Sequence, residues 1–205
     1  MCMQDENLRP YALGALYHHE ALNGTGYPKG LLKKDIPIEG QIIRVADEFD
    51  AIVSKRQYKT HIGITDTLKM LIEETRYVPK AVALKSIEEN TKLGRLNPKI
   101  VRTLFKVVIE DIEYEISNIF DYSKYLRTQI ERLEKINNYD IKISKTKRQK
   151  KKDYYNECIK LLLRDAEDNR NYKYVLEEYR TALFKRTEII NRLYGEIKEI
   201  KKLRC

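Results

Sequence analysis

Apolar side chains recur at helical spacing along most of the chain, and prolines interrupt them only before about residue 113. The pattern predicts five helices in this first part: Leu8–His19, Gln41–Ser54, 65–74, Pro79–Asn90 and Pro98–Glu113. Each of the last two carries a proline where a first helical turn tolerates it. An irregular, glycine-rich loop is expected over 21–39. In the second helix the apolar residues are expected to share one face: Ile42, Val45, Ala46, Phe49 and Val53.

Beyond Glu113 the chain contains no proline and a single glycine, Gly195, and its apolar residues follow a heptad spacing. Two segments carry this spacing: Ile112, Ile116, Ile119, Leu126, Ile130 and Leu133, and later Leu176, Tyr179, Leu183, Ile190, Leu193, Ile197 and Ile200. A shorter apolar helix is predicted between them, over Tyr154–Arg164. We therefore expect an all-α protein, with a partial helical lobe over 1–113 and a long antiparallel hairpin or three-helix coiled coil over 114–205.

Composition and charge narrow the class of protein. The three cysteines are widely scattered, which argues against a disulfide framework and favours a reducing compartment. No signal segment and no apolar run of membrane-spanning length is present, so we expect a cytoplasmic protein without a membrane partner. The net charge of +9 suits phosphate-bearing ligands. The basic run Lys145–Lys152 contains no interleaved aromatic residue, which favours a solvated hairpin tip over a nucleic-acid surface. The exposed tail is expected to mediate homodimerisation or docking.

The candidate metal ligands are His18, His19 and Asp47. Adjacent side chains on a regular helix diverge by about 100°, so both histidines can reach one metal cluster only if the helix ends there. The breakers Asn23 and Gly24 predict such an end, and Asp47 on the following helix could face the same cavity. Imidazole together with carboxylate suits iron, manganese, nickel or zinc. The alternative is a polar helix end without ligands, but the nearby Gly-Tyr-Pro turn and acidic helix favour the metal site.

Further polar residues follow on the same helix and in the preceding loop. Asp50 lies one turn beyond the candidate ligand, and Arg56 and Lys59 come at and just past the helix end. Arginine can bind phosphate oxygens through two parallel hydrogen bonds, and lysine adds a point charge. The alternative is that these cations only complement the helix dipole. The loop GTGYPKG, residues 24–30, could cradle a substrate with its backbone amides and the Tyr27 ring, or could be only a tight turn.

Together, HHE-x-x-x-G-x-GYP-x-G and VAD-x-FDA-x-x-S-x-R-x-YK resemble the second half of an HD-GYP domain, a subclass of the HD metal-dependent phosphohydrolases. The segment KLGRLNPKIV, residues 92–101, resembles the stretch that closes such domains. The resemblance covers roughly residues 8–113. It implies a phosphodiesterase that hydrolyses cyclic di-GMP or a related nucleotide. It also implies two or three divalent transition-metal ions, with iron or manganese expected.

The resemblance also implies a role for each matching position. His18 and His19 would bind one metal ion, and Asp47 would bind a neighbouring one. Asp50 and Lys59 would be the catalytic residues near the scissile phosphate. The substrate-binding residues would be Gly26, Tyr27, Pro28, Arg56 and Lys59.

The family's His-Asp doublet and a further histidine ligand precede the HHE segment, but the seventeen residues before His18 contain no histidine. We therefore expect the C-terminal half of an HD-GYP phosphohydrolase, split or truncated and inactive alone, that an upstream HD half completes in cis or in trans. One alternative is a degenerate module that binds a cyclic dinucleotide without cutting it. The other is an interaction protein that acts through its coiled-coil tail.

Overall fold

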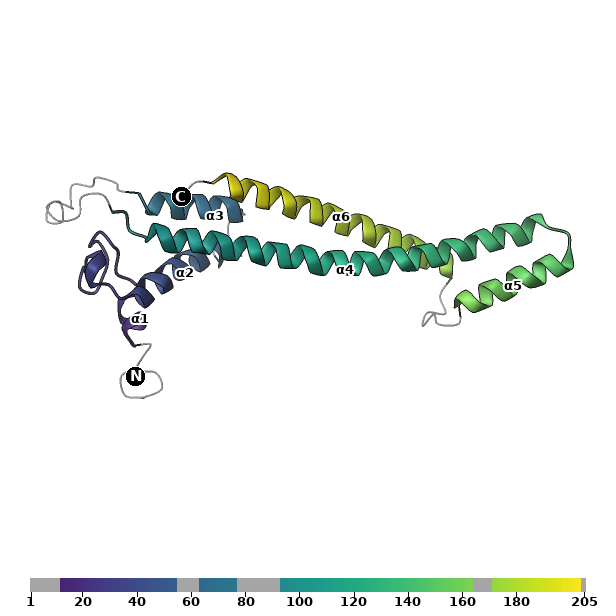
Figure 1. Cartoon of the computed structure of the whole chain (residues 1–205), viewed down its shortest axis with the longest axis horizontal. Helices are drawn as coiled ribbons and strands as arrows, with labels where there is room; N and C mark the ends of the chain where they lie inside the picture. Colours follow the sequence, from purple (N-terminus) through teal and green to yellow (C-terminus); the bar gives the residue numbers. More distant parts are fainter. Residues whose placement is uncertain (1–11, 55–62, 77–92, 164–170, 204–205) are drawn as a thin grey trace. The chain divides into compact units, whose positions relative to one another are not determined.

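The computed structural model describes residues 12–54, 63–76, 93–163 and 171–203, and every regular element in these segments is helical (Figure 1). The elements are α1 (Ala12–Tyr17), the 3-10 helix η2 (Lys33–Asp35), α2 (Ile38–Ser54), α3 (Ile64–Glu74), α4 (Pro98–Lys145), α5 (Gln149–Leu163) and α6 (Tyr172–Lys202). One isolated antiparallel bridge joins Asn23 to Leu32. The prediction of an all-α protein is confirmed. No helix in the described segments is long and apolar enough to cross a membrane.

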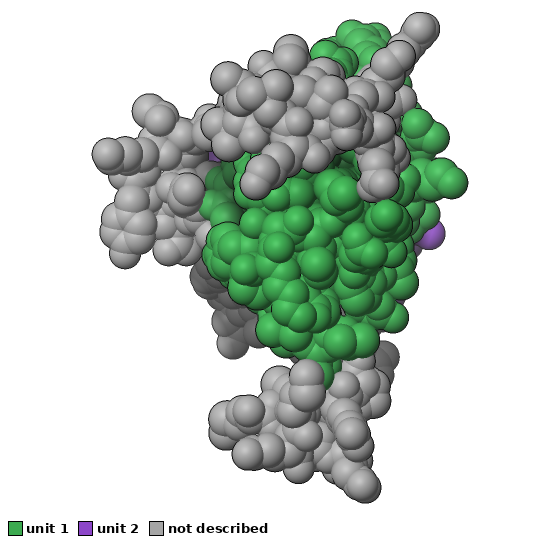
Figure 2. All heavy atoms as spheres, turned by 90° about the vertical axis from the view of Figure 1, so that its left-hand side faces the viewer, with its two compact units in different colours: residues 1–111, 196–205 green, residues 112–195 purple. Residues whose placement is uncertain are grey.

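The chain divides into two compact units (Figure 2). Unit 1 comprises residues 1–111 and 196–205, and unit 2 comprises residues 112–195. Both α4 and α6 contribute one stretch to each unit, because each helix extends past a unit boundary.

The core of unit 1 combines residues from distant parts of the sequence. α2 contacts both α1 and α3, and the C-terminal stretch of α6 lies beside α3 (Figure 1). The buried apolar residues of α3 recur at intervals of three and four, so they form one face of that helix. The core residues from α3, α4 and α6 are Leu68, Leu71 and Ile72 of α3, Val101, Phe105 and Val108 of α4, and Ile197 and Ile200 of α6.

α2 buries a partly polar face, which differs from the expected apolar one. Val45 is buried as expected, but Ile42 is 49% exposed and Ala46 is exposed too, so the expectation is wrong for these two residues. The buried neighbours of Val45 are Gln41 and Arg44. The Gln41 amide oxygen accepts a hydrogen bond from Asn97 at 2.8 Å. Buried polar groups are tolerated when they are hydrogen-bonded, and apolar periodicity carries no information about such partners.

In unit 2, α4 and α6 pair in antiparallel fashion, as the heptad pattern predicts. Tyr172 at the start of α6 donates a hydrogen bond to Asp140 near the end of α4. Arg180, further along α6, pairs with Glu134 at 2.7 Å. The α4 partner therefore comes earlier in the sequence as α6 proceeds, which defines an antiparallel pair. The core cluster of this hairpin is Ile130, Leu133, Ile136, Val175 and Leu176.

The largest differences from the expected helix boundaries lie in α4 and at the basic run. α4 is one continuous helix of 48 residues, where a lobe helix ending at Glu113 and a separate hairpin helix were expected. No proline or glycine lies between residues 99 and 145, so nothing in the backbone interrupts it. Only residues 146–148 of the basic run lie between helices, since α5 begins at Gln149. The expected helix Pro79–Asn90 lies outside the described residues, as do residues 8–11.

Candidate functional site

The two histidines come directly after the last residue of α1, and their rings lie side by side. We call His18 and His19 the histidine pair; their ring centroids are 4.0 Å apart. The Nδ1 atom of His18 lies 2.8 Å from the carbonyl oxygen of Ala15. A carbonyl oxygen can only accept a hydrogen bond, so Nδ1 carries the proton and Nε2 of the neutral ring keeps its lone pair. This is the tautomer that a histidine needs to bind a metal ion through Nε2.

The Gly-Tyr-Pro loop folds back onto the second histidine. The Tyr27 N–H donates to the His19 carbonyl oxygen at 3.2 Å. The Tyr27 ring stacks on the His19 ring, with centroids 4.7 Å apart and 25° between the planes. A Cβ atom at Gly26 would lie 2.3 Å from the Ala21 nitrogen and 2.5 Å from the Glu20 Cα, so only glycine permits this close approach. The HHE and GYP motifs therefore form one surface.

Glu20 holds the other side of the same loop, although sequence reasoning assigned it no role. Its side chain is buried, and its carboxylate accepts hydrogen bonds from the N–H groups of Lys29 at 2.7 Å and Leu31 at 2.8 Å. A buried carboxylate is stable only when its oxygens are bonded in this way. The amides of a glycine-rich loop lack helix or strand partners and need acceptors, but the sequence does not mark which residue supplies them.

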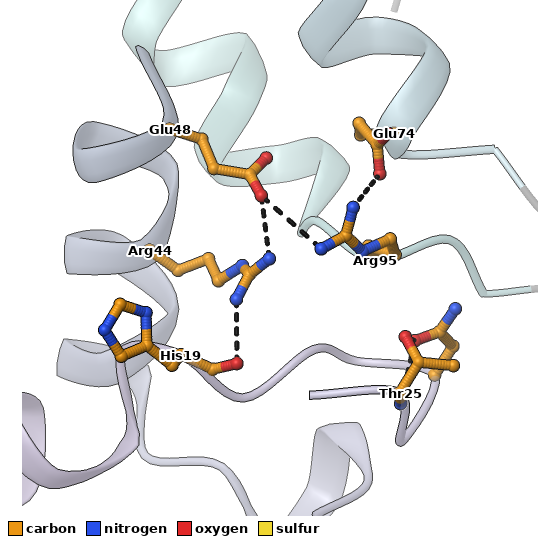
Figure 3. A network of polar contacts seen from close by, with 7 residues as sticks. His19, Thr25, Arg44, Glu48, Glu74 and Arg95 are labelled. Carbon is orange, nitrogen blue, oxygen red and sulfur yellow. Dashed lines mark hydrogen bonds and ion pairs between the residues drawn. The ribbon is translucent and has the colours of Figure 1, made fainter. Parts of the chain in front are cut away.

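A charged network lies beside the histidine segment (Figure 3). Arg44 of α2 is 8% exposed and donates to the His19 carbonyl oxygen at 2.8 Å and to Glu48 at 2.7 Å. The guanidinium of Arg95 extends the network, lying 3.8 Å from Glu48 and 3.2 Å from Glu74. The His19 carbonyl oxygen therefore accepts hydrogen bonds from both the Tyr27 N–H and Arg44. Sequence reasoning singled out neither arginine.

The expected metal ligands are brought together only in part. Asp47 and Asp50 are exposed on α2. Among the residues that the structure describes, no group of three His, Cys, Asp or Glu side chains is arranged to hold a metal ion. The histidine pair has the right donor chemistry for a transition metal, but these residues do not by themselves complete a centre. Arg56 and Lys59 lie outside the described residues, and the roles given to all these side chains stay predictions.

Comparison with known proteins points to the same part of the chain. Residues 1–81 match the HD domain. A cyclic di-GMP phosphodiesterase from Thermotoga maritima is 60% identical over 85 residues, which are 40% of this chain and 23% of that protein. The cyclic di-GMP phosphodiesterase response regulator RpfG from Xanthomonas campestris pv. campestris is 50% identical over 56 residues, 27% of this chain and 15% of RpfG. A 3′3′-cGAMP-specific phosphodiesterase 2 from Vibrio cholerae is 53% identical over 45 residues, 22% of this chain and 9% of that enzyme.

These findings support an HD or HD-GYP family for the HD segment, residues 1–81. The segment contains the histidine pair, the GYP loop and all of α2 and α3. The chain spans less than a quarter of the length of each of these curated relatives. No solved structure matches the chain.

Proposed function

We propose that this chain is the C-terminal half of an HD-GYP phosphohydrolase that acts on cyclic di-GMP or a related cyclic dinucleotide. The observation that carries the proposal is the packing of the GYP loop on the histidine pair. Tyr27 stays 60% exposed while it stacks on His19. An exposed aromatic face beside two imidazoles offers a stacking surface for a nucleobase next to candidate metal ligands. The names of the relatives support the same substrate class.

The polar side chains divide into metal ligands and substrate contacts. In this proposal the histidine pair binds one divalent metal ion and Asp47 binds a neighbouring one. Iron or manganese suits a set of imidazoles and carboxylates, and such ions supply Lewis-acid chemistry to a phosphodiester. Asp50 would lie near the scissile phosphate. Arg56 and Lys59 would bind its oxygens, with Lys59 also acting in catalysis.

In this proposal an upstream HD half adds further ligands and packs against exposed apolar residues of α1 and α2. Five large apolar residues of α1 and α2 are each at least 40% exposed, and we call this set the open face: Leu13, Leu16, Ile38, Ile42 and Ile43. Asp47 lies one helical turn beyond Ile43, so this residue of the open face and an expected ligand share one side of α2. An upstream HD half, in the same chain or in another, would cover the open face and add ligands.

A complementation assay tests the proposal. The chain is mixed with cyclic di-GMP and Mn²⁺ or Fe²⁺, with and without the separately produced upstream half of the Thermotoga maritima relative. We expect no hydrolysis by the chain alone and linear product when both halves are present. His18→Ala should abolish that activity, whereas Glu188→Gln, a change at an exposed position of α6, should not alter it. Absence of hydrolysis with both halves and either metal would count against the phosphohydrolase assignment.

A binding module without catalysis is the second candidate. The observation in its favour is that Tyr27 of the GYP loop stacks on His19 although the described residues contain no group of three side chains that could hold a metal ion. Isothermal titration with cyclic di-GMP separates the two candidates. Binding without hydrolysis in the presence of the upstream half and metal would support the module, because a catalytic pair of halves would consume the ligand.

A further inference from the structure

Arg44 is a buried cation whose presence is hard to explain by stability alone. Its side chain is 8% exposed, and its Nε atom is buried without a hydrogen-bond partner in the part of the chain that the structure describes. A buried N–H without a partner destabilises the folded state. A methionine could fill similar space without that cost, so packing does not account for an arginine here.

The two terminal nitrogens of Arg44 join two different elements. Nη1 donates to the carbonyl oxygen of His19 at 2.8 Å, and Nη2 donates to Glu48 at 2.7 Å, one turn further along α2. The guanidinium is planar and rigid, so it fixes the direction of the His19 carbonyl relative to α2. Lysine has no such fork and could satisfy only one of these partners with the same geometry.

The His19 carbonyl also controls the GYP loop. It accepts the N–H of Tyr27 at 3.2 Å in addition to Arg44, which uses both lone pairs of the oxygen. The ring of the same histidine stacks on the ring of Tyr27. A rotation of this peptide group would therefore disturb the histidine ring, the tyrosine amide and the stacked pair together.

Arg95 anchors the network at its other end (Figure 3). Its guanidinium lies near Glu48 and pairs with Glu74 on α3. The Arg95 carbonyl oxygen accepts a hydrogen bond at 3.0 Å from the N–H of Leu22, which follows the histidine pair in the sequence. Glu48, which accepts a hydrogen bond from Arg44, is therefore linked to α3 through Arg95. The backbone of Arg95 also binds the segment that follows the histidine pair.

We propose that Arg44 is a positioning residue for the site. It sets the orientation of His19 and Tyr27 through the His19 carbonyl and does not itself touch the substrate. The purpose of that positioning rests on the proposed function, whereas the positioning itself is measurable without any metal or nucleotide.

The test uses nuclear magnetic resonance on the full 205-residue chain. The readouts are hydrogen exchange of the Tyr27 amide and the nuclear Overhauser effect between the His19 and Tyr27 rings. In Arg44→Met we expect Tyr27 exchange to become roughly tenfold faster or more, as the loss of a hydrogen bond from a charged donor gives, and the ring contact to disappear. Arg44→Lys should restore part of both signals.

Arg186→Met is the matched control. Arg186 is a half-buried arginine of unit 2 that also donates to a main-chain carbonyl, that of Ala182 at 3.1 Å. It should leave Tyr27 exchange and the ring contact unchanged. Wild-type values of both readouts in Arg44→Met would overturn the proposal, even if the melting temperature falls, because a merely structural arginine gives that pattern.

A second variant decides the question if Arg44→Met does not fold. Glu48→Gln keeps the shape of the acceptor and removes its charge, so Tyr27 exchange should be faster than in the wild type, and unchanged exchange would overturn the proposal. The complementation assay stays a separate readout. Loss of the ring contact in Arg44→Met without hydrolysis by any mixture of halves would uphold the positioning role while the proposed function fails.

Discussion

At the residue scale, the strictest steric demand in the site falls on Gly26, and Gly195 provides its opposite. We expect Gly26→Ala to lower the free energy of unfolding by about 2 kcal/mol or more, because its Cβ would meet backbone atoms of residues 20 and 21 that cannot move aside. No atom lies within 4 Å of a Cβ at Gly195 inside α6. Gly195→Ala should therefore raise the free energy of unfolding by about 0.5–1 kcal/mol. Urea unfolding followed by circular dichroism measures both, and effects of the same sign would contradict the steric argument.

Site residues with distinctive side-chain chemistry could be predicted from the sequence, whereas residues that form hydrogen bonds with the main chain were missed. The histidine pair and Tyr27 were predicted to share a site, and the structure places them in contact. Glu20 and Arg44 were missed because their partners are backbone N–H and C=O groups. Every residue carries such groups, so no pattern of residue types marks which of them a buried charge will meet.

At the element scale, heptad spacing predicts which helices pair, but it does not say what fixes their register. The spacing predicted the pairing of α4 with α6 in the hairpin, because apolar residues at intervals of three and four form a continuous seam. It could not predict the polar face of α2, where Gln41 and Arg44 are buried through hydrogen bonds to segments distant in sequence. In the hairpin the register is marked by polar pairs, foremost Tyr172 with Asp140.

Tyr172→Phe should weaken unit 2 in a pH-dependent way. Near pH 7 we expect the free energy of unfolding to fall by about 1 kcal/mol, the contribution of one hydrogen bond. Burial, followed by the hydrogen bond to Asp140, raises the pKa of Tyr172 above its ordinary value of 10.0. The unfolded chain therefore loses this proton first, so the stabilisation is complete below about pH 10 and is lost as the pH rises above it.

Urea unfolding at about pH 8 and about pH 11 checks this expectation. The difference between the wild type and Tyr172→Phe should shrink by about 1 kcal/mol at the higher pH, and the other tyrosines and lysines cancel in that difference. Tyr174→Phe is the control, since Tyr174 is 59% exposed two residues further along α6. A constant gap between wild type and Tyr172→Phe would show that the hydroxyl does not titrate differently in the folded chain.

At the scale of the whole molecule, an apolar pattern in sequence does not reveal which partner covers it. The heptad pattern of the tail continues through Ile197 and Ile200, yet residues 196–205 belong to unit 1. Ile42 was expected on the apolar face of α2 that packs in the core, yet it lies on the open face together with Ile43. Whether an apolar face is buried depends on which chain segment packs against it. We propose that the upstream HD half packs against the open face, whereas homodimerisation through the tail stays a separate prediction.

Ile42→Asp separates these two uses of apolar surface. Ile42 is 49% exposed, so the substitution should change the stability of the chain alone by less than about 0.5 kcal/mol. Covering the open face would bury the new carboxylate against apolar side chains, which costs several kcal/mol unless the charge is paired. In the complementation assay we therefore expect Ile42→Asp to reduce hydrolysis at least tenfold. Leu161→Asp, at a 61% exposed position of α5, should leave it unchanged. Full hydrolysis by Ile42→Asp would show that the completing half does not cover this face, and a loss with Leu161→Asp would point instead to an interface on the tail.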